Sequence, residues 1–386
     1  MRIVIAPDSF KESLSATGVA AAIAEGVRDA APDADIVCVP MADGGEGSLD
    51  AVLAATGGER RELRVRNANG ESAPAGWAWL GQGRAFIEMA SAAGLEQIPP
   101  AERKPLEAST YGVGQLIAAA LDSGARHIVI GLGGSATNDA GAGLLQALGV
   151  KLLDAGGEAL PPGGAALARL HRIDLRDADP RLKDTVFELA VDVDNPLCGP
   201  CGASAIFGPQ KGASPADVAT LDAAIARFAD VCAAHFGRDE RDTPGMGAAG
   251  GLGFAVKTCF TAGFRPGVEL VAELSGLAAA LKGADLVFTG EGRMDAQTLL
   301  GKTPAGVARY AGKENIPVIA LAGSLGEGYE QLYQAGITAA FSIAPGPVTL
   351  QDACRNAAGY LRHRARDCMR AWLAGRAAGC PGTAPN

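Results

Sequence analysis

The sequence lacks a long apolar run, a basic tract and a secretory signal, and each absence excludes a class of protein. No stretch of about 18 apolar residues occurs, which excludes a membrane-spanning helix. The formal net charge is -9 and charges of both signs are dispersed along the chain, which excludes a nucleic-acid-binding surface. The first apolar run, Arg2–Ala6, is too short for a signal peptide and Asp8 follows it. We therefore expect a cytoplasmic protein.

Eight cysteines lie scattered along the chain, and this spread indicates reduced thiols rather than a disulfide framework. One pair, Cys198-Gly-Pro-Cys201, has the spacing of a redox dithiol and of half a zinc site. A redox motif would carry an aromatic residue just before the first cysteine, and Leu197 stands there instead. No second half-site has convincing spacing. We interpret the pair as a turn whose glycine and proline matter more than its thiols.

Glycine is abundant, with 53 residues among 386, as tight turns between strands and helices require. A chain of this length predicts two domains. Short apolar strands alternate with helices up to Thr56 and again after Lys282, which is typical of a parallel sheet covered by helices. Between these parts, strands at Ala75–Leu80 and Arg84–Glu88, with Asn-Gly and Gly-Gln-Gly turns, indicate antiparallel pairing.

The fold class that follows is α/β. We expect a Rossmann- or flavodoxin-like parallel-sheet domain interrupted by a second α/β domain with a mixed sheet. The first domain is predicted to comprise residues 1–62 and 282–374, and the inserted domain residues 63–281. Residues 375–386 are small and polar, so we predict a disordered tail there.

Charged residues follow the first two predicted strands. Asp8, Ser9 and Lys11 come after the first strand, and the segment Asp43–Gly47 after the second. In open α/β sheets ligands bind at the carboxyl ends of the strands, so these side chains are candidates to bind a phosphate, a metal or a substrate acid. Capping of a turn or helix is the alternative for Asp8, Ser9 and Asp43.

A glycine-rich loop at 131–139 follows the strand His127–Gly131. Its residues 131–136 satisfy G-x-G-x-x-A, and Asp154 lies near the spacing of a ribose-binding acid. This pattern supports an alternative function, an NAD(P)-dependent dehydrogenase. Asn138 and Asp139 argue against it, because a carboxylate there suits a substrate hydroxyl or Mg²⁺ better than a bare pyrophosphate.

Three further segments carry polar side chains or exposed backbone. Asp192 and Asp194 lie two residues apart on one face of a strand end, as in a metal site or a general base. Lys211 lies in a glycine-bounded turn, where it can pair with a phosphate or a carboxylate. The run of small residues at 244–253 could present backbone N–H groups to a phosphate, with close helix packing as the alternative.

The segment 289–304 contains Glu291, Arg293 and Lys302 and follows the predicted strand Asp285–Thr289. So many charged residues in one loop point to a binding role. The Gly-Lys-Thr at 301–303 resembles the end of a P-loop, but Ala296 stands where that motif needs glycine, so it is not a Walker A sequence. Lys302 still lies near a predicted helix start, where phosphate binds readily.

Taken together, seven segments resemble the bacterial glycerate kinase family (type I, glycerate 2-kinase-like) in order along nearly the whole chain. They are PDSFKESLSA (7–16), MADGGEG (41–47), GLGGSATND (131–139), DVDNPLCGP (192–200), FGPQKGA (207–213), GAAGGLG (247–253) and TGEGRMDAQTLLGKTP (289–304). The resemblance implies two α/β domains with the active site between them. It also implies transfer of the ATP γ-phosphate to glycerate, with 2-phosphoglycerate expected before 3-phosphoglycerate.

Phosphoryl transfer needs positioning and charge neutralisation, and this assigns roles as hypotheses. Asp192 is the first choice and Asp8 the second for the general base. ATP and Mg²⁺ are the expected cofactors and glycerate the expected partner, with a homodimer considered as the assembly. A ligand-binding protein without turnover is a third function class. The remaining assignments are phosphate stabilisation by Lys211 and Lys302; substrate binding by Lys11, Ser9, Arg293, Asn138 and Asp139; nucleotide binding by Gly133, Gly134, Ser135, Gly250 and Gly251; and metal binding by Asp192, Asp194 and Glu291.

Overall fold

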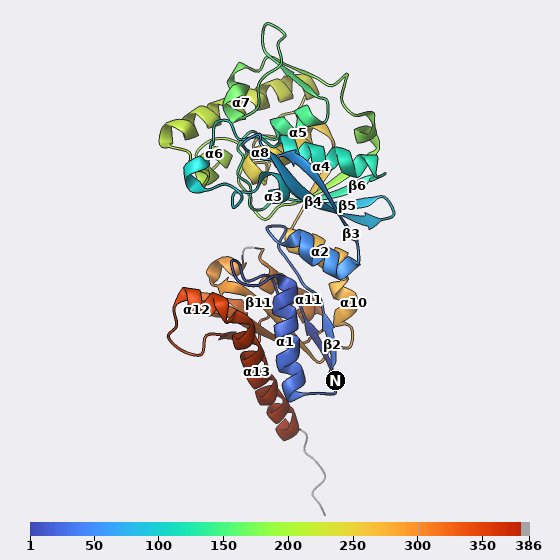
Figure 1. Ribbon diagram of the computed structural model, residues 1–386, viewed down its shortest axis with the longest axis vertical. Helices are drawn as coiled ribbons and strands as arrows, with labels where there is room; N and C mark the ends of the chain where they lie inside the picture. Colours follow the sequence, from blue (N-terminus) through green and yellow to red (C-terminus); the bar gives the residue numbers. More distant parts are fainter. Residues whose placement is uncertain (300, 380–386) are drawn as a thin grey trace, which may run out of the picture. The chain divides into compact units, whose positions relative to one another are not determined.

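The computed structural model describes residues 1–299 and 301–379, and the chain divides into two compact units (Figure 1). The first unit comprises residues 1–43, residues 50–56 and the chain from Val268 onward, and the second comprises residues 44–49 and 57–267. Residues 44–49, 57–62 and 268–281 therefore lie in the other unit from the one that the sequence predicts. The reason is packing: Glu59–Arg66 is a strand of the second unit's sheet, and Val268 packs against Gly306 of the first unit.

The first unit contains a five-stranded sheet in which all strands are parallel, in the order β13-β12-β11-β1-β2. In chain order along the sheet this is 2-1-3-4-5, so the order reverses between β1 and β11. Open sheets of this kind bind ligands outside the carboxyl ends of the strands at that reversal point. The predicted flavodoxin-like sheet is confirmed. The strands are β1 (Arg2–Ile5), β2 (Asp35–Cys38), β11 (Leu286–Met294), β12 (Val318–Leu325) and β13 (Ala339–Ser342).

Two long helices from opposite ends of the chain, α1 (Ala16–Ala30) and α13 (Ala357–Gly379), lie side by side over one face of this sheet (Figure 1). The Ser15 hydroxyl caps α1 by accepting the N–H of Gly18. The helices approach so closely that a Cβ at Gly26 would lie 2.1 Å from the carbonyl oxygen of Arg362. Because α13 runs to Gly379, the helix includes the first residues of the predicted tail, and residues 380–386 lie outside the described residues.

The second unit contains a six-stranded mixed sheet in the order β10-β9-β6-β5-β4-β3. The strands β5, β6, β9 and β10 are parallel, whereas β3, β4 and β5 form an antiparallel meander. Its two turns are the predicted Asn-Gly and Gly-Gln-Gly turns, and Gly70 has the positive φ of +85° that such turns require. The strands are β3 (Glu59–Arg66), β4 (Ser72–Gly81), β5 (Arg84–Glu88), β6 (His127–Gly131), β9 (Val186–Ala190) and β10 (Thr261–Arg265). A separate antiparallel pair is β7 (Lys151–Leu153) with β8 (Arg172–Asp174).

The other helices pack around these sheets, and the longest, α7, begins with a reciprocal capping box between Ser214 and Asp217. The remaining α-helices are α2 (Ser48–Thr56), α3 (Ala90–Ala93), α4 (Tyr111–Asp122), α5 (Ala142–Ala147), α6 (Ala203–Phe207), α7 (Pro215–Phe236), α8 (Ala248–Cys259), α9 (Gly267–Leu274), α10 (Leu277–Leu281), α11 (Thr303–Lys313) and α12 (Leu350–Arg355). The 3-10 helices are Pro100–Glu102, Gly164–Arg169, Pro180–Asp184, Pro209–Lys211, Ala296–Leu299 and Tyr329–Tyr333.

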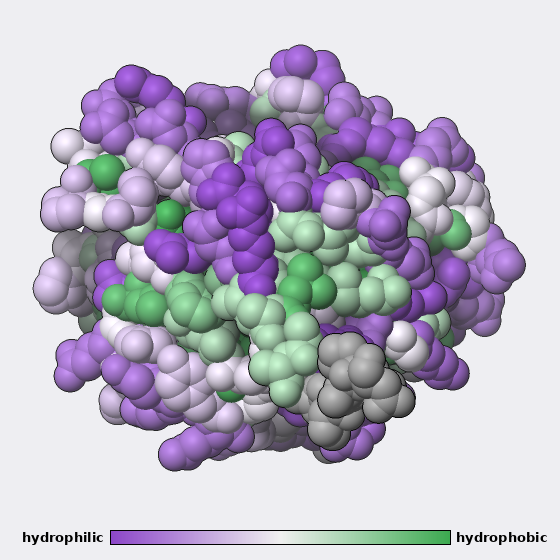
Figure 2. Space-filling view, turned by 90° about the horizontal axis from the view of Figure 1, so that it is seen from below, coloured by the Kyte–Doolittle hydropathy of each residue, from purple (hydrophilic) through white to green (hydrophobic). Residues whose placement is uncertain are grey.

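The surface carries mainly hydrophilic side chains on the face that Figure 2 shows, with an apolar band across its centre. Among the described residues, none of the helices has the length and apolar character needed to span a bilayer. The seven cysteines in the described part of the chain are all free thiols.

Candidate active site

A cluster of carboxylates lies at the carboxyl ends of β1, β2 and β11 in the first unit. Asp8 follows β1, and its backbone N–H donates to the carbonyl of Gly290 in β11. Its carboxylate accepts the Ser9 N–H and the Thr303 hydroxyl, each at 2.6 Å. Burial and the charge of Asp43 raise the pKa of Asp8 from 3.8 to about 7. A carboxyl group that titrates near neutral pH is suited to general acid–base work.

Glu291 is a second acid of this cluster, and its side chain is buried. Its carboxylate accepts the Thr298 hydroxyl at 2.7 Å and pairs with the Lys302 ammonium at 3.3 Å. Burial raises its pKa, which the Thr298 bond and Lys302 oppose. The sequence predicts that Glu291 follows a strand that ends at Thr289, but β11 continues to Met294 and pairs with β12. Glu291 is therefore fixed by a sheet rather than held in a loop.

The other residues predicted for the first unit lie nearer the solvent. Lys11 and Arg293 are exposed, and Ser9 is half-buried. The Arg293 guanidinium pairs with Asp295 at 3.0 Å. The structure thus brings Asp8, Glu291 and Lys302 together.

In the second unit the loop 44–49 packs on the glycine-rich loop after β6. The Gly133 N–H donates to the carbonyl of Gly44 at 3.3 Å. A Cβ at Gly133 would lie 2.4 Å from the Cα of Gly45, so only glycine fits there. The buried Glu88 carboxylate holds this loop by accepting the N–H groups of Gly47 and Leu49. Glu88 carries no motif in the sequence, and its place at the end of the predicted strand Arg84–Glu88 is the signal that points to it.

A buried lysine lies at the centre of the second unit's polar cluster. Lys211 is 2% exposed, and its ammonium donates to the Ser135 hydroxyl at 2.8 Å and the Thr137 carbonyl at 2.6 Å. Burial lowers its pKa from 10.5 to about 7, and the Asp139 carboxylate opposes this shift. The side chain of Asn138 is also buried and donates to the Ser204 hydroxyl at 2.8 Å.

Asp139 anchors the backbone around this cluster. Its carboxylate accepts the N–H groups of Thr110, Gly141 and Gly143 and the Thr110 hydroxyl. Burial raises its pKa, and these bonds oppose the shift. Four donors bind the two carboxylate oxygens, so Asp139 holds the backbone of this loop in place.

Three consecutive residues near the start of α8, Ala249, Gly250 and Gly251, have left-handed backbone. A Cβ at Gly250 would lie 2.0 Å from the Thr137 carbonyl oxygen, and one at Gly251 2.7 Å from a Leu197 methyl carbon. The loop thus packs directly on the 137–140 and 192–197 segments. Close packing, the alternative considered from the sequence, explains both glycines.

The two acids after β9 lie nearer the solvent than Asp8 and Glu291. The Asp192 carboxylate accepts the Gly267 N–H at 3.0 Å, which ties the loop after β9 to the start of α9. Among residues 1–299 and 301–379, no group of three or more His, Cys, Asp or Glu side chains is arranged to hold a metal ion. Mg²⁺ is commonly bound by one or two carboxylates together with substrate phosphates, and the carboxylate of Glu291 suits that mode.

The dehydrogenase alternative is not supported by the geometry of its two elements. The loop after β6 is filled by loop 44–49 at Gly133, and α5 begins only at Ala142. Asp154, the expected ribose ligand, accepts the N–H groups of Gly156 and Glu158 in the turn after β7. That strand belongs to the separate two-stranded sheet, so Asp154 does not follow a strand parallel to β6.

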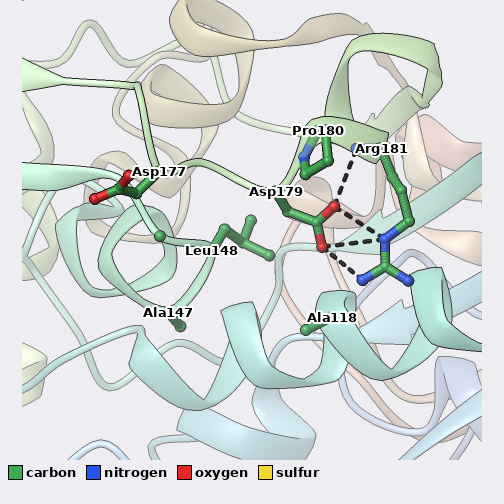
Figure 3. Close-up of a pocket in the computed structure, with 8 residues that line it drawn as sticks. Ala118, Ala147, Leu148, Asp177, Asp179, Pro180 and Arg181 are labelled. Carbon is green, nitrogen blue, oxygen red and sulfur yellow. Dashed lines mark hydrogen bonds and ion pairs between the residues drawn. The ribbon is translucent and has the colours of Figure 1, made fainter.

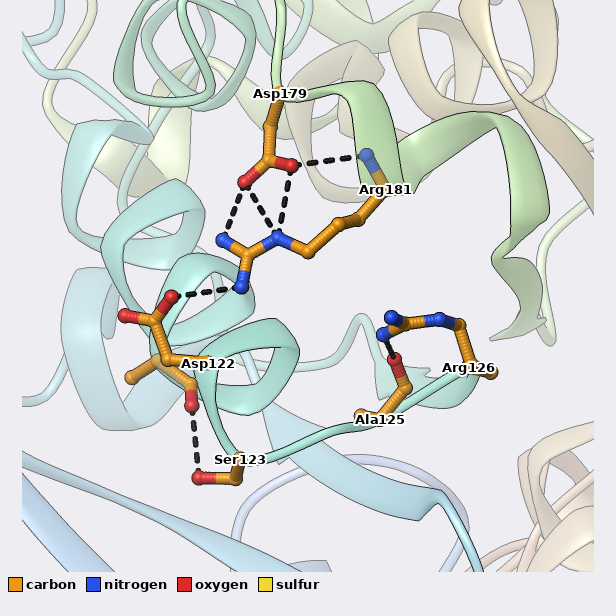
Figure 4. A network of polar contacts seen from close by, with 7 residues as sticks. Asp122, Ser123, Ala125, Arg126, Asp179 and Arg181 are labelled. Atoms are coloured by element: carbon orange, nitrogen blue, oxygen red, sulfur yellow. Dashed lines mark hydrogen bonds and ion pairs between the residues drawn. The ribbon is translucent and has the colours of Figure 1, made fainter.

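A depression of about 450 Å³ lies elsewhere on the second unit (Figure 3). Its charged groups are paired. Arg181 binds Asp179 with two nitrogens (Figure 3) and Asp122 at 2.8 Å (Figure 4). Asp177 pairs with Lys151. Since the acids and the guanidinium satisfy one another, we assign no ligand to it. Its lining residues are Ala118, Ala147, Leu148, Gly149, Asp177, Asp179, Pro180 and Arg181.

Comparison with known proteins points to one family. Residues 3–373 match the glycerate kinase family. A glycerate kinase of Bacillus subtilis is 49% identical over 95% of this chain and 96% of its own length. A glycerate 2-kinase of Escherichia coli is 50% identical over 92% of this chain and 94% of its own length. A crystal structure described as glycerate kinase 2 from Salmonella typhimurium superposes with a TM-score of 0.88 at 48% identity, covering 98% of this chain and 99% of that one.

Proposed function

Since this chain belongs to the glycerate kinase family, we propose that it transfers the γ-phosphoryl group of ATP to a hydroxyl group of D-glycerate, giving ADP and phosphoglycerate. The observation that carries this proposal is the match over residues 3–373, which includes both units. Both clusters described above lie within that range.

The 2-hydroxyl group is the acceptor in this proposal, so the product is 2-phosphoglycerate. The support is the 50% identity with the Escherichia coli protein named glycerate 2-kinase. Phosphorus NMR of the product distinguishes the two positions by coupling to protons. The phosphorus of the 2-phosphate couples through oxygen to one CH proton, and that of the 3-phosphate to the two protons of a CH₂ group.

Asp8 is the general base that accepts the proton of the attacking hydroxyl. Its pKa near 7 supports this choice, because a base is most effective when its pKa lies near the working pH. Asp192, the first choice from the sequence, is exposed, whereas Asp8 is half-buried. We therefore rank Asp8 first and Asp192 second.

ATP and Mg²⁺ are the cofactors in this proposal. Lys302 would offer its ammonium group to the ATP phosphates, and Glu291 would offer a carboxylate to Mg²⁺, which would neutralise phosphate charge. Thr303 keeps the Asp8 carboxylate in place through its 2.6 Å bond. Lys11, Ser9 and Arg293 stay predicted substrate contacts. The glycines of loops 131–134 and 247–253, together with Ser135, stay predicted nucleotide contacts, with close packing as the other explanation for the glycines.

The direct test is an assay of the purified chain with ATP, Mg²⁺ and D-glycerate. We expect ADP and phosphoglycerate to form in equal amounts. Chromatography measures the ADP, and phosphorus NMR measures the phosphoglycerate. A control without glycerate measures ATP hydrolysis alone. The proposal fails if ADP formation does not depend on glycerate. Reduction of NAD⁺ by D-glycerate in the absence of ATP would instead support the dehydrogenase, and binding without turnover the ligand-binding class.

A further inference from the structure

The hydroxyl of Thr298 lies between the turn after β11 and the carboxylate of Glu291. Thr298 belongs to the 3-10 helix Ala296–Leu299 and is 0% exposed. Its Oγ1 accepts the backbone N–H of Asp295 at 3.1 Å and donates to Oε1 of Glu291 at 2.7 Å. A hydroxyl carries a single proton, and the Asp295 N–H occupies one of its lone pairs, so that proton is directed at Glu291. A length of 2.7 Å is typical of a hydroxyl that binds an ionised carboxylate.

The turn that carries Thr298 is held by bonds at both of its ends. The Asp295 carboxylate accepts the Gln297 N–H at 3.0 Å, and the Asp295 carbonyl accepts the Thr298 N–H at 3.0 Å. An aspartate that accepts an N–H two residues further along is a common helix cap. Because the Thr298 hydroxyl accepts the Asp295 N–H in return, each residue fixes the other. The turn begins where β11 ends at Met294, so the sheet and the turn together set the position of the hydroxyl.

The carboxylate of Glu291 has a different partner on each oxygen. Oε1 binds the fully buried Thr298, whereas Oε2 pairs with the Lys302 ammonium at 3.3 Å. The Lys302 side chain is 34% exposed and that of Glu291 11%, so Oε1 is held in the interior and the contact at Oε2 lies nearer the solvent. The backbone of Glu291 is fixed by its pairing with Ala322 of β12. The last torsion of a glutamate side chain is soft, and the bond from Thr298 restricts it.

We infer that Thr298 is a positioning residue of the nucleotide site: its hydroxyl fixes Oε1 of Glu291, which leaves Oε2 oriented to bind the Mg²⁺ of the nucleotide. This inference rests on the proposed function, in which Glu291 offers its carboxylate to Mg²⁺ and Lys302 its ammonium to the phosphates. Thr298 touches neither the cation nor the phosphates and acts through Glu291 alone. Without the hydroxyl, the carboxylate has to be ordered when the nucleotide binds, and that ordering lowers the affinity.

The test measures ATP binding by calorimetry without glycerate, once with Mg²⁺ and once with EDTA. Thr298→Val keeps the shape of the side chain and removes the hydroxyl. We expect its affinity for ATP to fall about 10-fold with Mg²⁺, in line with the value of a hydrogen bond to a charged group, and to change little with EDTA. Thr298→Ser keeps the hydroxyl and should bind ATP as the wild type does in both buffers.

A double-mutant cycle with Glu291→Ala shows whether Thr298 acts through Glu291. When Glu291→Ala is already present, Thr298→Val should weaken ATP binding no further, because the carboxylate that the hydroxyl orients is gone. Thr185→Val is the matched control. Thr185 is also 0% exposed, and its hydroxyl donates to the Arg181 carbonyl at 2.9 Å in the second unit. Its loss should leave the ATP affinity unchanged in both buffers.

Each outcome either supports or overturns the inference. An equal loss of affinity with Mg²⁺ and with EDTA, additive losses in the cycle, or normal binding by Thr298→Val would overturn it and leave Thr298 a residue that only caps the turn after β11. Thermal unfolding establishes that each variant folds, and Thr298→Ala replaces Thr298→Val if the latter does not. A wild-type protein that shows the expected Mg²⁺ response but no glycerate-dependent ADP formation would refute the proposed function and leave the role of Thr298 in place.

Discussion

The acidic cluster of the first unit predicts that one substitution will both stabilise the protein and inactivate it. Asp8 accepts hydrogen bonds from Ser9 and Thr303, yet burial and Asp43 still raise its pKa from 3.8 to about 7. Its ionised form is therefore unfavourable in the folded chain. Asp8→Asn keeps the shape of the side chain and removes that charge, so we expect a higher free energy of unfolding together with a loss of turnover.

The magnitude follows from the pKa. A tenfold change in an acid dissociation constant is worth about 1.4 kcal/mol, so a rise in pKa from 3.8 to about 7 is on the order of a few kcal/mol. Between pH 3.8 and about 7, the folded chain keeps the Asp8 proton while the unfolded chain has lost it. The contribution of protonated Asp8 to the free energy of unfolding is therefore fully present below pH 3.8 and is lost as the pH rises through about 7. The advantage of Asp8→Asn should be near zero at about pH 4 and largest above about pH 7. Removal of a general base should lower kcat about 10²- to 10⁴-fold.

Urea unfolding from about pH 4 to about pH 8, in buffer with EDTA so that no cation shields the cluster, measures the stability difference. The coupled release of ADP measures kcat. Asp29→Asn is the control, because the pKa of Asp29 is lowered by its bonds to Arg362 on the surface of the same unit. It should lose a little stability at neutral pH and keep full activity. An Asp8→Asn protein that is less stable than the wild type at the alkaline end of this range would show that the Asp8 charge does not destabilise the fold, and one with normal turnover would show that Asp8 is not the base.

Three further substitutions test other parts of the two clusters. Lys211→Met should raise the free energy of unfolding by a few kcal/mol at pH 7 and below, because it removes a buried charge. The lowered pKa of Lys211 makes the stability of the wild type rise between about pH 7 and 10.5, so the gain should vanish near pH 10.5. Urea unfolding over that pH range measures the difference. Gly250→Ala should destabilise the protein by far more than the roughly 1–2 kcal/mol that a left-handed alanine costs, because its Cβ would meet the Thr137 carbonyl. Gly57 has a φ of +65° and no atom within 4 Å of such a Cβ, so Gly57→Ala should cost only that amount. Thermal unfolding compares the two variants. Thr303→Val removes a bond that lowers the pKa of Asp8, so the acidic limb of the kcat/KM profile against pH should move to higher pH.

The strands and motifs could be predicted because each depends on a short stretch of sequence. Apolar runs of a few residues followed by polar loops predicted that Asp8 would lie near the carboxyl end of a parallel strand, and the sheet order confirms the fold class. The seven motifs in order predicted the family, which the match over residues 3–373 confirms.

What the sequence missed depends on contacts between distant segments. Gly290 and Glu291 read as loop residues because glycine is a poor strand former, but pairing with β12 extends β11 to Met294. The glycines of the 247–253 loop read as a phosphate cradle, whereas the Thr137 carbonyl against Gly250 explains one of them by packing. Glu88 carried no motif at all, and its role emerged only from its bonds to Gly47 and Leu49.

Residue types and their spacing along the chain were enough to establish the α/β class and the family. The contacts between distant polar side chains came from the folded structure alone: Thr303 binds Asp8 across 295 residues, and Lys211 binds Ser135 across 76. Burial decided their ionisation as well, since desolvation moves the pKa values of Asp8 and Lys211 from opposite directions to about 7. Desolvation depends on every atom that packs around a group, and spacing along the chain does not reveal it.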